Sequence, residues 1–153
     1  MTLITCSYLA VTATTMKTIK VKLEQAEAAR QTNHPDAALS LADKALAHAR
    51  ESNDPLVIAF ALRHAANIRS KLGHFDQSAL EIAEAIRIYR DHAADHILDV
   101  ANALRIEALN AERRAQASWH EAETLYASVH VEAGVTGAQH HLQHLTAALG
   151  GPS

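Results

Sequence analysis

A short motif occurs twice in this chain. Residues 59–66 read AFALRHAA and residues 101–108 read ANALRIEA, so both fit the pattern A-x-A-L-R-x-x-A. The shared residues recur at intervals of three and four, which places them on one side of a helix. Self-similarity at a period between about 20 and 50 residues is typical of stacked repeats, and the two copies are separated by a distance in this range. The motif therefore predicts a chain built from repeated helical units.

The composition favours an all-α protein. Alanine and leucine are abundant, whereas only 5 glycines and 3 prolines occur among the 153 residues. A chain of this length usually forms a single domain with one extended core. The formal net charge of −3 gives no general case for binding nucleic acid, because proteins that do so usually present a clearly basic face.

Signals for helix ends recur at regular intervals along the chain. Proline in the first helical turn is expected from NHP at 33–35 and NDP at 53–55, and Gly73 suits a helix C-terminus. Two capping boxes predict later helix starts, at Ser118 with Glu121 and at Thr136 with Gln139. The sequence GGP at 150–152 predicts the end of the last helix. The sequence thus predicts seven helices, at about 17–31, 35–51, 55–72, 75–91, 96–114, 119–132 and 137–149.

The second helix of each predicted pair carries an equivalent stripe, spaced by four, three and one residues. The stripes are Ala38, Ala42, Ala45 and Leu46, then Ser78, Ile82, Ala85 and Ile86, then Ala122, Tyr126, Val129 and His130. Short links make each pair antiparallel, and a pair that cannot bury its apolar face alone must stack on its neighbours. We expect three stacked helix pairs and one extra helix.

At this level the chain resembles the tetratricopeptide repeat (TPR) family, in the longer-period form found in kinesin light chains. Leu62 and Ala66, followed by LGHFDQSALEIAEAI, fit the family pattern of a leucine, small residues, a glycine turn and an aromatic residue. DHILDVANAL followed by WHEAETLY is similar to the light-chain type. The likeness covers residues 17–133. It departs from the family at Lys22, where a leucine belongs, and at Ala115, where the glycine belongs.

The resemblance implies an all-α, right-handed αα superhelix, a TPR-like solenoid. Its parts would be a tail at 1–16, disordered or preceding a natural start at Met16, three helix pairs at 17–133, and a capping helix at 134–150. The cap would bury one stripe, Ala138, Leu142, Leu145 and Leu149. Ala66 and Ala108 would let neighbouring helices approach closely, and Phe75 and Trp119 would belong to the core.

In this family the first helix of each pair lines a concave groove. The corresponding positions here are Phe60, Arg63, Asn67 and Lys71, then Asn102, Arg105, Leu109 and Arg113. A basic strip of this kind would attract an acidic or carboxylate-bearing segment of a protein or peptide. The resemblance therefore implies a non-enzymatic, peptide-binding scaffold or adaptor without a cofactor. The alternative is that the arginines pair with Glu107, Glu112 and nearby acidic residues and keep the groove soluble.

Two other functions stay open. The chain could associate with itself through its apolar start or an incompletely covered terminal helix, and so form a homodimer. The apolar residues at the start are Leu3, Ile4, Tyr8, Leu9 and Val11. It could also be the regulatory fragment of a larger signalling system.

Histidines and the lone cysteine are the remaining candidates for chemistry. His140 and His144 are one helical turn apart, a spacing that can chelate a metal, but a third ligand is lacking. A second polar cluster comprises Asp91, His92, Asp95 and His96. We expect solvated or capping histidines in both places and no metal site.

Cys6 has no partner for a disulfide and no histidine set beside it. No Gly-rich phosphate loop or converging set of carboxylates indicates an enzyme. The apolar start lacks a basic segment before Lys17 and is too short to span a bilayer. We therefore expect a cytoplasmic protein that does not associate with membranes.

Overall fold

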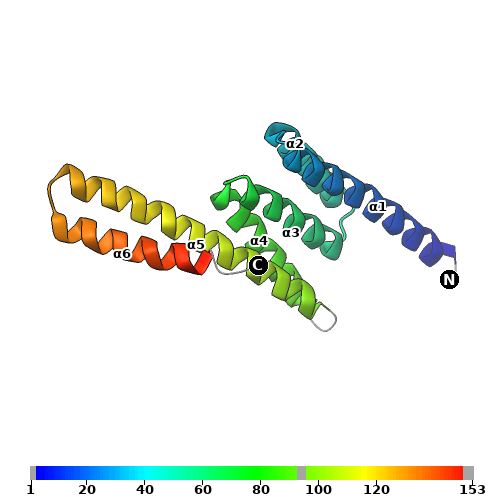
Figure 1. Ribbon diagram of the computed structural model, residues 1–153. Coiled ribbons are helices and arrows are strands. Elements are labelled where there is room, and N and C mark those ends of the chain that lie inside the picture. The colour runs from blue at the N-terminus through cyan, green and yellow to red at the C-terminus, as the bar shows by residue number, and fades with distance from the viewer. Residues whose placement is uncertain (1–2, 93–95, 150–153) are drawn as a thin grey trace. The chain divides into compact units, whose positions relative to one another are not determined.

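The computed structural model describes the backbone of residues 3–92 and 96–149, and side chains within 13–92 and 96–147. This part of the chain is all-helical and contains no strand, which confirms the prediction of an all-α protein (Figure 1). The chain divides into two compact units, one ending at Glu107 and the other beginning at Ala108. The helices are α1 (Leu3–Gln31), α2 (Pro35–Glu51), α3 (Pro55–Lys71), α4 (Phe75–Asp91), α5 (Ile97–Ser128) and α6 (Glu132–Leu149).

Three consecutive helices of the first unit have the same length and spacing. α2, α3 and α4 each contain 17 residues and begin at residues 35, 55 and 75. Each is preceded by a residue with positive φ: Asn33 at 60°, Asn53 at 54° and Gly73 at 84°. Asparagine and glycine tolerate this left-handed conformation, which ends the preceding helix. The predicted bounds of these helices are confirmed to within one residue.

Adjacent helices of the first unit pack against one another: α1 on α2, α2 on α3 and α3 on α4, while α1 also contacts α3. Fully buried alanines form the stripe predicted on α2, at Ala38, Ala42 and Ala45. Because a methyl group is small, these positions let neighbouring helix axes lie close together. Ile19 and Leu23 of α1 are buried in the same core.

The stripe predicted on α4 is also buried. Ser78, Ile82 and Ala85 have no exposed surface, and Ala66 of α3 is fully buried as predicted. The Ser78 hydroxyl donates a hydrogen bond of 2.7 Å to the carbonyl oxygen of Ala66. This bond satisfies a buried hydroxyl and fixes where α4 lies along α3.

A buried arginine links three helices of the first unit. Arg69 of α3 is 1% exposed and donates to Glu81 of α4 at 2.8 Å and to Asp43 of α2. Burial raises the pKa of Glu81 to about 6, against the opposing effect of the Arg69 charge. Such a cation is costly to bury unless it is paired, so all three helices must be in place together.

The helix break predicted between 114 and 119 is wrong. α5 runs without interruption through Ser118 to Ser128, so Ser118 lies inside the helix and caps nothing. The physical reason is the sequence RAQAS at 114–118, which contains neither glycine nor proline and whose alanines favour helix. Ala115 lies where the resemblance predicts a glycine, and the chain continues as a helix at that point.

The second unit is therefore a helical hairpin, and the predicted third pair, 96–114 with 119–132, does not form. The turn follows Ser128, and His130 adopts a positive φ of 58°. Trp119 stacks on His141 with ring centroids 4.2 Å apart, and Glu123 accepts a 2.8 Å hydrogen bond from Gln139. These contacts hold α5 against α6.

The third predicted stripe is mostly exposed as a result. Tyr126 is 40% and Val129 65% exposed, and His130 is exposed too. The final helix begins at Glu132 rather than at residue 137, so Thr136 is not its cap. On this helix Ala138 and Leu142 are buried as predicted. The side chain of Leu149 and the stop at 150–152 lie outside the described residues.

The N-terminal helix also differs from the prediction. α1 begins at Leu3 and not at residue 17, so the backbone of the expected tail is helical from that point. The side chains of Cys6 and of the apolar residues proposed for self-association, Leu3, Ile4, Tyr8, Leu9 and Val11, lie outside the described residues.

The two copies of the opening motif occupy different environments. In the first copy Ala59, Leu62 and Ala66 are fully buried. In the second copy all three equivalents, Ala101, Leu104 and Ala108, are exposed, so the structural role predicted for Ala108 is wrong. α3 packs against α1, α2 and α4, whereas α5 presents a different side, Ala103 and Ile106, to Ile82 and Ile86 of α4.

Enlarging the two equivalent alanines, Ala66 and Ala108, should change the stability of the protein by different amounts. Ala66→Leu is expected to lower the free energy of unfolding by about 1–3 kcal/mol, because extra methyl groups overpack the interface of α3. Ala108→Leu serves as the matched control, since its site is exposed, and should change stability by less than about 0.5 kcal/mol. Urea denaturation measures both. Equal effects would contradict the different environments of the two copies.

Replacing Glu81 by glutamine should remove a pH-dependent contribution to stability. The pKa of Glu81 is about 6 when folded against an ordinary 4.5, so the folded state binds more protons within this window. The free energy of unfolding therefore falls by about 2 kcal/mol as pH rises through the window. Urea unfolding of the wild type and Glu81→Gln across it measures the difference. A difference that does not vary with pH would contradict burial as the dominant influence.

Candidate functional site

A groove of about 440 Å³ lies between α1 and α3 in the first unit. Its lining combines charged, polar and apolar side chains: Lys20, Leu23, Glu24 and Glu27 from α1, and Phe60, His64, Asn67, Ile68 and Lys71 from α3. The α3 residues recur every three or four positions, so one side of that helix faces the groove. α1 supplies the opposite wall in the same way.

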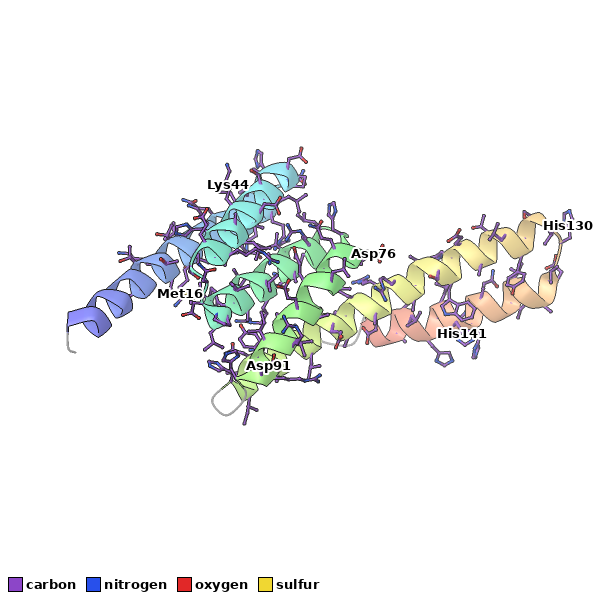
Figure 2. The ribbon with its side chains drawn as sticks, turned by 180° about the vertical axis from the view of Figure 1, so that it is seen from behind. Met16, Lys44, Asp76, Asp91, His130 and His141 are labelled. Atoms are coloured by element: carbon purple, nitrogen blue, oxygen red, sulfur yellow. The ribbon has the colours of Figure 1, made fainter. Side chains whose placement is uncertain are left out.

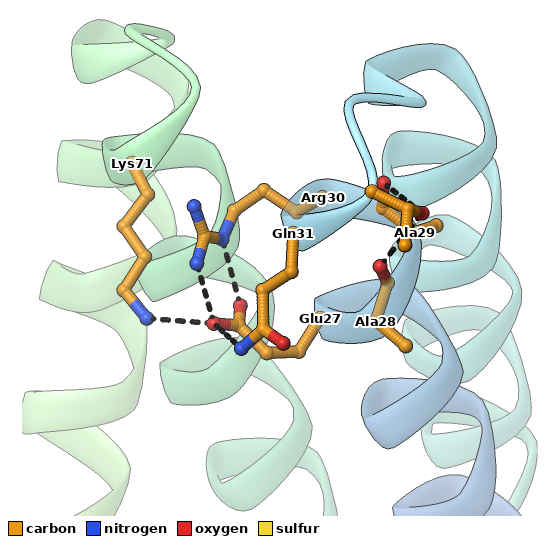
Figure 3. A network of polar contacts seen from close by, with 7 residues as sticks. Glu27, Ala28, Ala29, Arg30, Gln31 and Lys71 are labelled. Atoms are coloured by element: carbon orange, nitrogen blue, oxygen red, sulfur yellow. Dashed lines mark hydrogen bonds and ion pairs between the residues drawn. The ribbon is translucent and has the colours of Figure 1, made fainter.

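One end of the groove is organised around a carboxylate, as Figure 3 shows. Glu27 accepts from Arg30 at 2.8 and 3.0 Å, from Gln31 at 3.3 Å and from Lys71 of α3 at 3.1 Å. The hydrogen bonds from Arg30, followed by the bond from Lys71, lower the pKa of Glu27 to about 2, although partial burial opposes them. Glu27 is therefore an anion at neutral pH and joins α1 to α3.

The other end is aromatic and carries positive charge. The rings of Phe60 and His64 have centroids 4.4 Å apart, and the ammonium of Lys20 lies 5.7 Å from the Phe60 ring. Burial, followed by the charge of Arg63, lowers the pKa of His64 to about 4. His64 is thus neutral at pH 7. Its Nε2 lies 3.1 Å from Nη2 of Arg63 and must accept that bond, because a guanidinium only donates.

Arg63 lies beside the groove and is already paired. Its guanidinium is 3.5 Å from Asp99 of α5, and its side chain is only 16% exposed. Asp99 is also 3.3 Å from Nδ1 of His96. The alternative in which the arginines pair with Glu107, Glu112 and nearby acidic residues thus holds for Arg63, whose partner is the nearby Asp99.

The eight residues predicted for the concave face are only partly brought together. Phe60, Asn67 and Lys71 line the groove, whereas Arg63 is turned to Asp99. The four predicted on α5 are half-buried or exposed: Asn102 is half-buried, and Arg105, Leu109 and Arg113 are exposed. Leu109 and Arg113 belong to the second unit, where Arg113 is 3.5 Å from the side-chain oxygen of Gln116.

The groove residues of α1 were missed from the sequence, although a signal for them exists. α2, α3 and α4 begin at evenly spaced positions, so the first helix of the preceding pair is expected two such steps before α3. Two steps back from Phe60, His64 and Asn67 are Lys20, Glu24 and Glu27. All three positions line the groove.

The histidine clusters were expected to be solvated or capping. His92 Nδ1 lies 2.8 Å from the carbonyl oxygen of Ile88, and His96 faces Asp99, so both make local contacts near helix ends. Asp95 lies outside the described residues. Within residues 3–92 and 96–149, no group of three or more His, Cys, Asp or Glu is placed to hold a metal ion. Among the helices described, none has the length and apolar character needed to cross a membrane.

Comparison with protein-family models, with curated protein sequences and with solved structures finds no match for this chain.

The titration of His64 tests the electrostatics of the groove. In the wild type its imidazole should titrate near 4. In Arg63→Gln the pKa should rise because a neighbouring positive charge is removed, yet remain below the ordinary value because burial persists. Two-dimensional NMR of the histidine rings measures both values. A wild-type pKa at the ordinary value of 6.5, unchanged in the variant, would contradict this environment.

Proposed function

We propose that this chain is a non-enzymatic, TPR-like scaffold whose groove between α1 and α3 binds a protein or peptide segment. The ligand is an extended segment that carries an acidic side chain or a free C-terminal carboxylate. The observation that carries the proposal is the lining of the groove, where two lysines, an asparagine and an aromatic ring lie beside two glutamates along two neighbouring helices. Peptide ligands commonly need apolar pockets together with a few polar groups that fix orientation.

The spacing of helices supports the TPR-like part of the proposal. α2, α3 and α4 are equal in length and begin at regular intervals, so the antiparallel pairs repeat with a constant period. The first helices of two consecutive pairs, α1 and α3, contact each other. That contact is typical of a superhelix in which first helices line the inner surface.

The preference for a carboxylate at one end of the groove follows from which basic groups are already occupied. Lys71 and Arg30 hold the carboxylate of Glu27, so an internal carboxylate occupies one end of the groove. At the other end Lys20 is exposed, and no ion pair of Lys20 is found within the described residues. A ligand carboxylate would bind there by charge-assisted hydrogen bonds, with an apolar side chain against Phe60.

Self-association is the second candidate, and one observation favours it. Apolar side chains near the turn of the α5–α6 hairpin are exposed: Leu125 60%, Tyr126 40%, Val129 65% and Val131 44%. Exposed apolar side chains gathered in one place often mark a protein interface. Sedimentation equilibrium over a range of protein concentrations distinguishes the two candidates, because only self-association makes the mass depend on concentration.

Charge reversal at Lys20 should weaken peptide binding. An array of peptides with free C-terminal carboxylates, each paired with its amidated form, supplies the ligands. Lys20→Glu should lower affinity for the bound carboxylate peptides by about tenfold or more, because a cation in the groove becomes an anion. Fluorescence anisotropy measures this affinity, and circular dichroism checks that the variants remain equally helical.

Lys44→Glu is the matched control for this experiment. Lys44 is an exposed lysine of α2 that does not line the groove (Figure 2), and its replacement changes the net charge equally. It should leave affinity within about twofold of the wild type. Equal losses in both variants, or equal binding of amidated peptides, would contradict carboxylate recognition in the groove.

A further inference from the structure

Two histidines on α6 converge in the hairpin of the second unit. His140 and His144 are four residues apart, and their Nε2 atoms lie 3.2 Å from each other. Their rings are inclined at 73° with centroids 4.5 Å apart. Both residues are exposed, so the pair is open to solvent. The sequence alone gives the spacing, whereas the structure adds the convergence of the two nitrogens.

The separation of these nitrogens suits two ligands of one metal ion. Two imidazole nitrogens at about 2.0–2.1 Å from a tetrahedral zinc lie about 3.3–3.4 Å apart. Ligands at right angles, as in square-planar copper or octahedral nickel, lie about 2.9 Å apart. The observed 3.2 Å falls between these values. A metal could therefore bind both nitrogens after only small rotations of the side chains.

The pair is held on a rigid support. His141, between the two in sequence, stacks on Trp119 of α5 at 4.2 Å with ring planes 8° apart, and Figure 2 shows it on the hairpin. This contact fixes how α6 is rotated against α5 and holds the His141 ring on Trp119, with its centroid 5.9 Å from that of the His140 ring. Gln139, one residue before His140, is bonded to Glu123 of α5. Rigid supporting contacts of this kind lower the ordering cost of binding a metal.

We propose that His140 and His144 form a two-histidine chelate for a divalent transition ion such as Cu²⁺, Ni²⁺ or Zn²⁺. Imidazole nitrogen suits these ions better than it suits Mg²⁺ or Ca²⁺, which prefer oxygen. The remaining coordination positions are filled by water, because no third protein ligand is placed there within the described residues.

Binding changes the tautomer of one ring. In the free chain, one Nε2–H donates to the other Nε2 across 3.2 Å. To bind the metal, the donating ring moves its proton to Nδ1, so that both Nε2 lone pairs face the ion. The two imidazoles stay neutral, no proton leaves either ring, and the ion keeps its charge.

Trp119 provides a direct measurement, because it is the only tryptophan in the chain. Cu²⁺ or Ni²⁺ bound by the pair would lie close to the ring stacked on Trp119 and quench its emission. Titration of the full-length, tag-free chain with NiCl₂ should give a saturable, one-to-one quench below about 1 mM. Calorimetry of the same titration gives the stoichiometry independently. MgCl₂ should have no effect at the same concentrations.

Variants separate this pair from the other histidines. His140→Ala and His144→Ala should each weaken nickel binding by about tenfold or more, since each leaves a single imidazole. His141→Phe is the control, because it keeps an aromatic ring on Trp119 but removes the ring nitrogens, and it should retain the wild-type affinity. The proposal is overturned if nickel gives no saturable quench. It is also overturned if the double variant His140→Ala/His144→Ala binds nickel as the wild type does.

Discussion

The ion pairs of Arg69 are the interaction on which the first unit depends most. A guanidinium that is 1% exposed is tolerated only because Asp43 of α2 and Glu81 of α4 approach it from either side. This requirement fixes the rotation of α3 about its own axis. The same rotation turns Phe60, the aromatic residue of the groove, towards α1. The buried cation therefore determines which side chains α3 presents to the groove.

Small residues explain why this arrangement repeats and where it stops. Alanines at Ala42, Ala45 and Ala66 keep the helices of the first unit close enough for Arg69 to reach its partners. Beyond α4 the pattern changes, because the sequence around Ala115 contains no glycine or proline to end a helix. The chain then extends as the long α5 and returns as α6, a hairpin with its own contacts.

Much of the first unit could be predicted from the sequence, because its helix ends are marked by proline, asparagine and glycine with strong local preferences. The burial of Arg69 could not, since arginine is normally exposed and its partners lie on two other helices, far from it in the sequence. The groove was predicted on α3 but not on α1, because Lys22 lies where the repeat pattern predicts a leucine. Capping residues such as Ser118 misled the prediction because a serine is tolerated inside a helix that alanines favour.

Mapping the bound peptide by NMR tests the central claim most directly. A ¹⁵N-labelled chain is titrated with a carboxylate peptide found on the array, and amide shifts are followed residue by residue. The account predicts saturable shifts in α1 between Lys20 and Glu27 and in α3 between Phe60 and Lys71, with little change in residues 108–149. Shifts concentrated in the α5–α6 hairpin, with the groove amides unmoved, would contradict it.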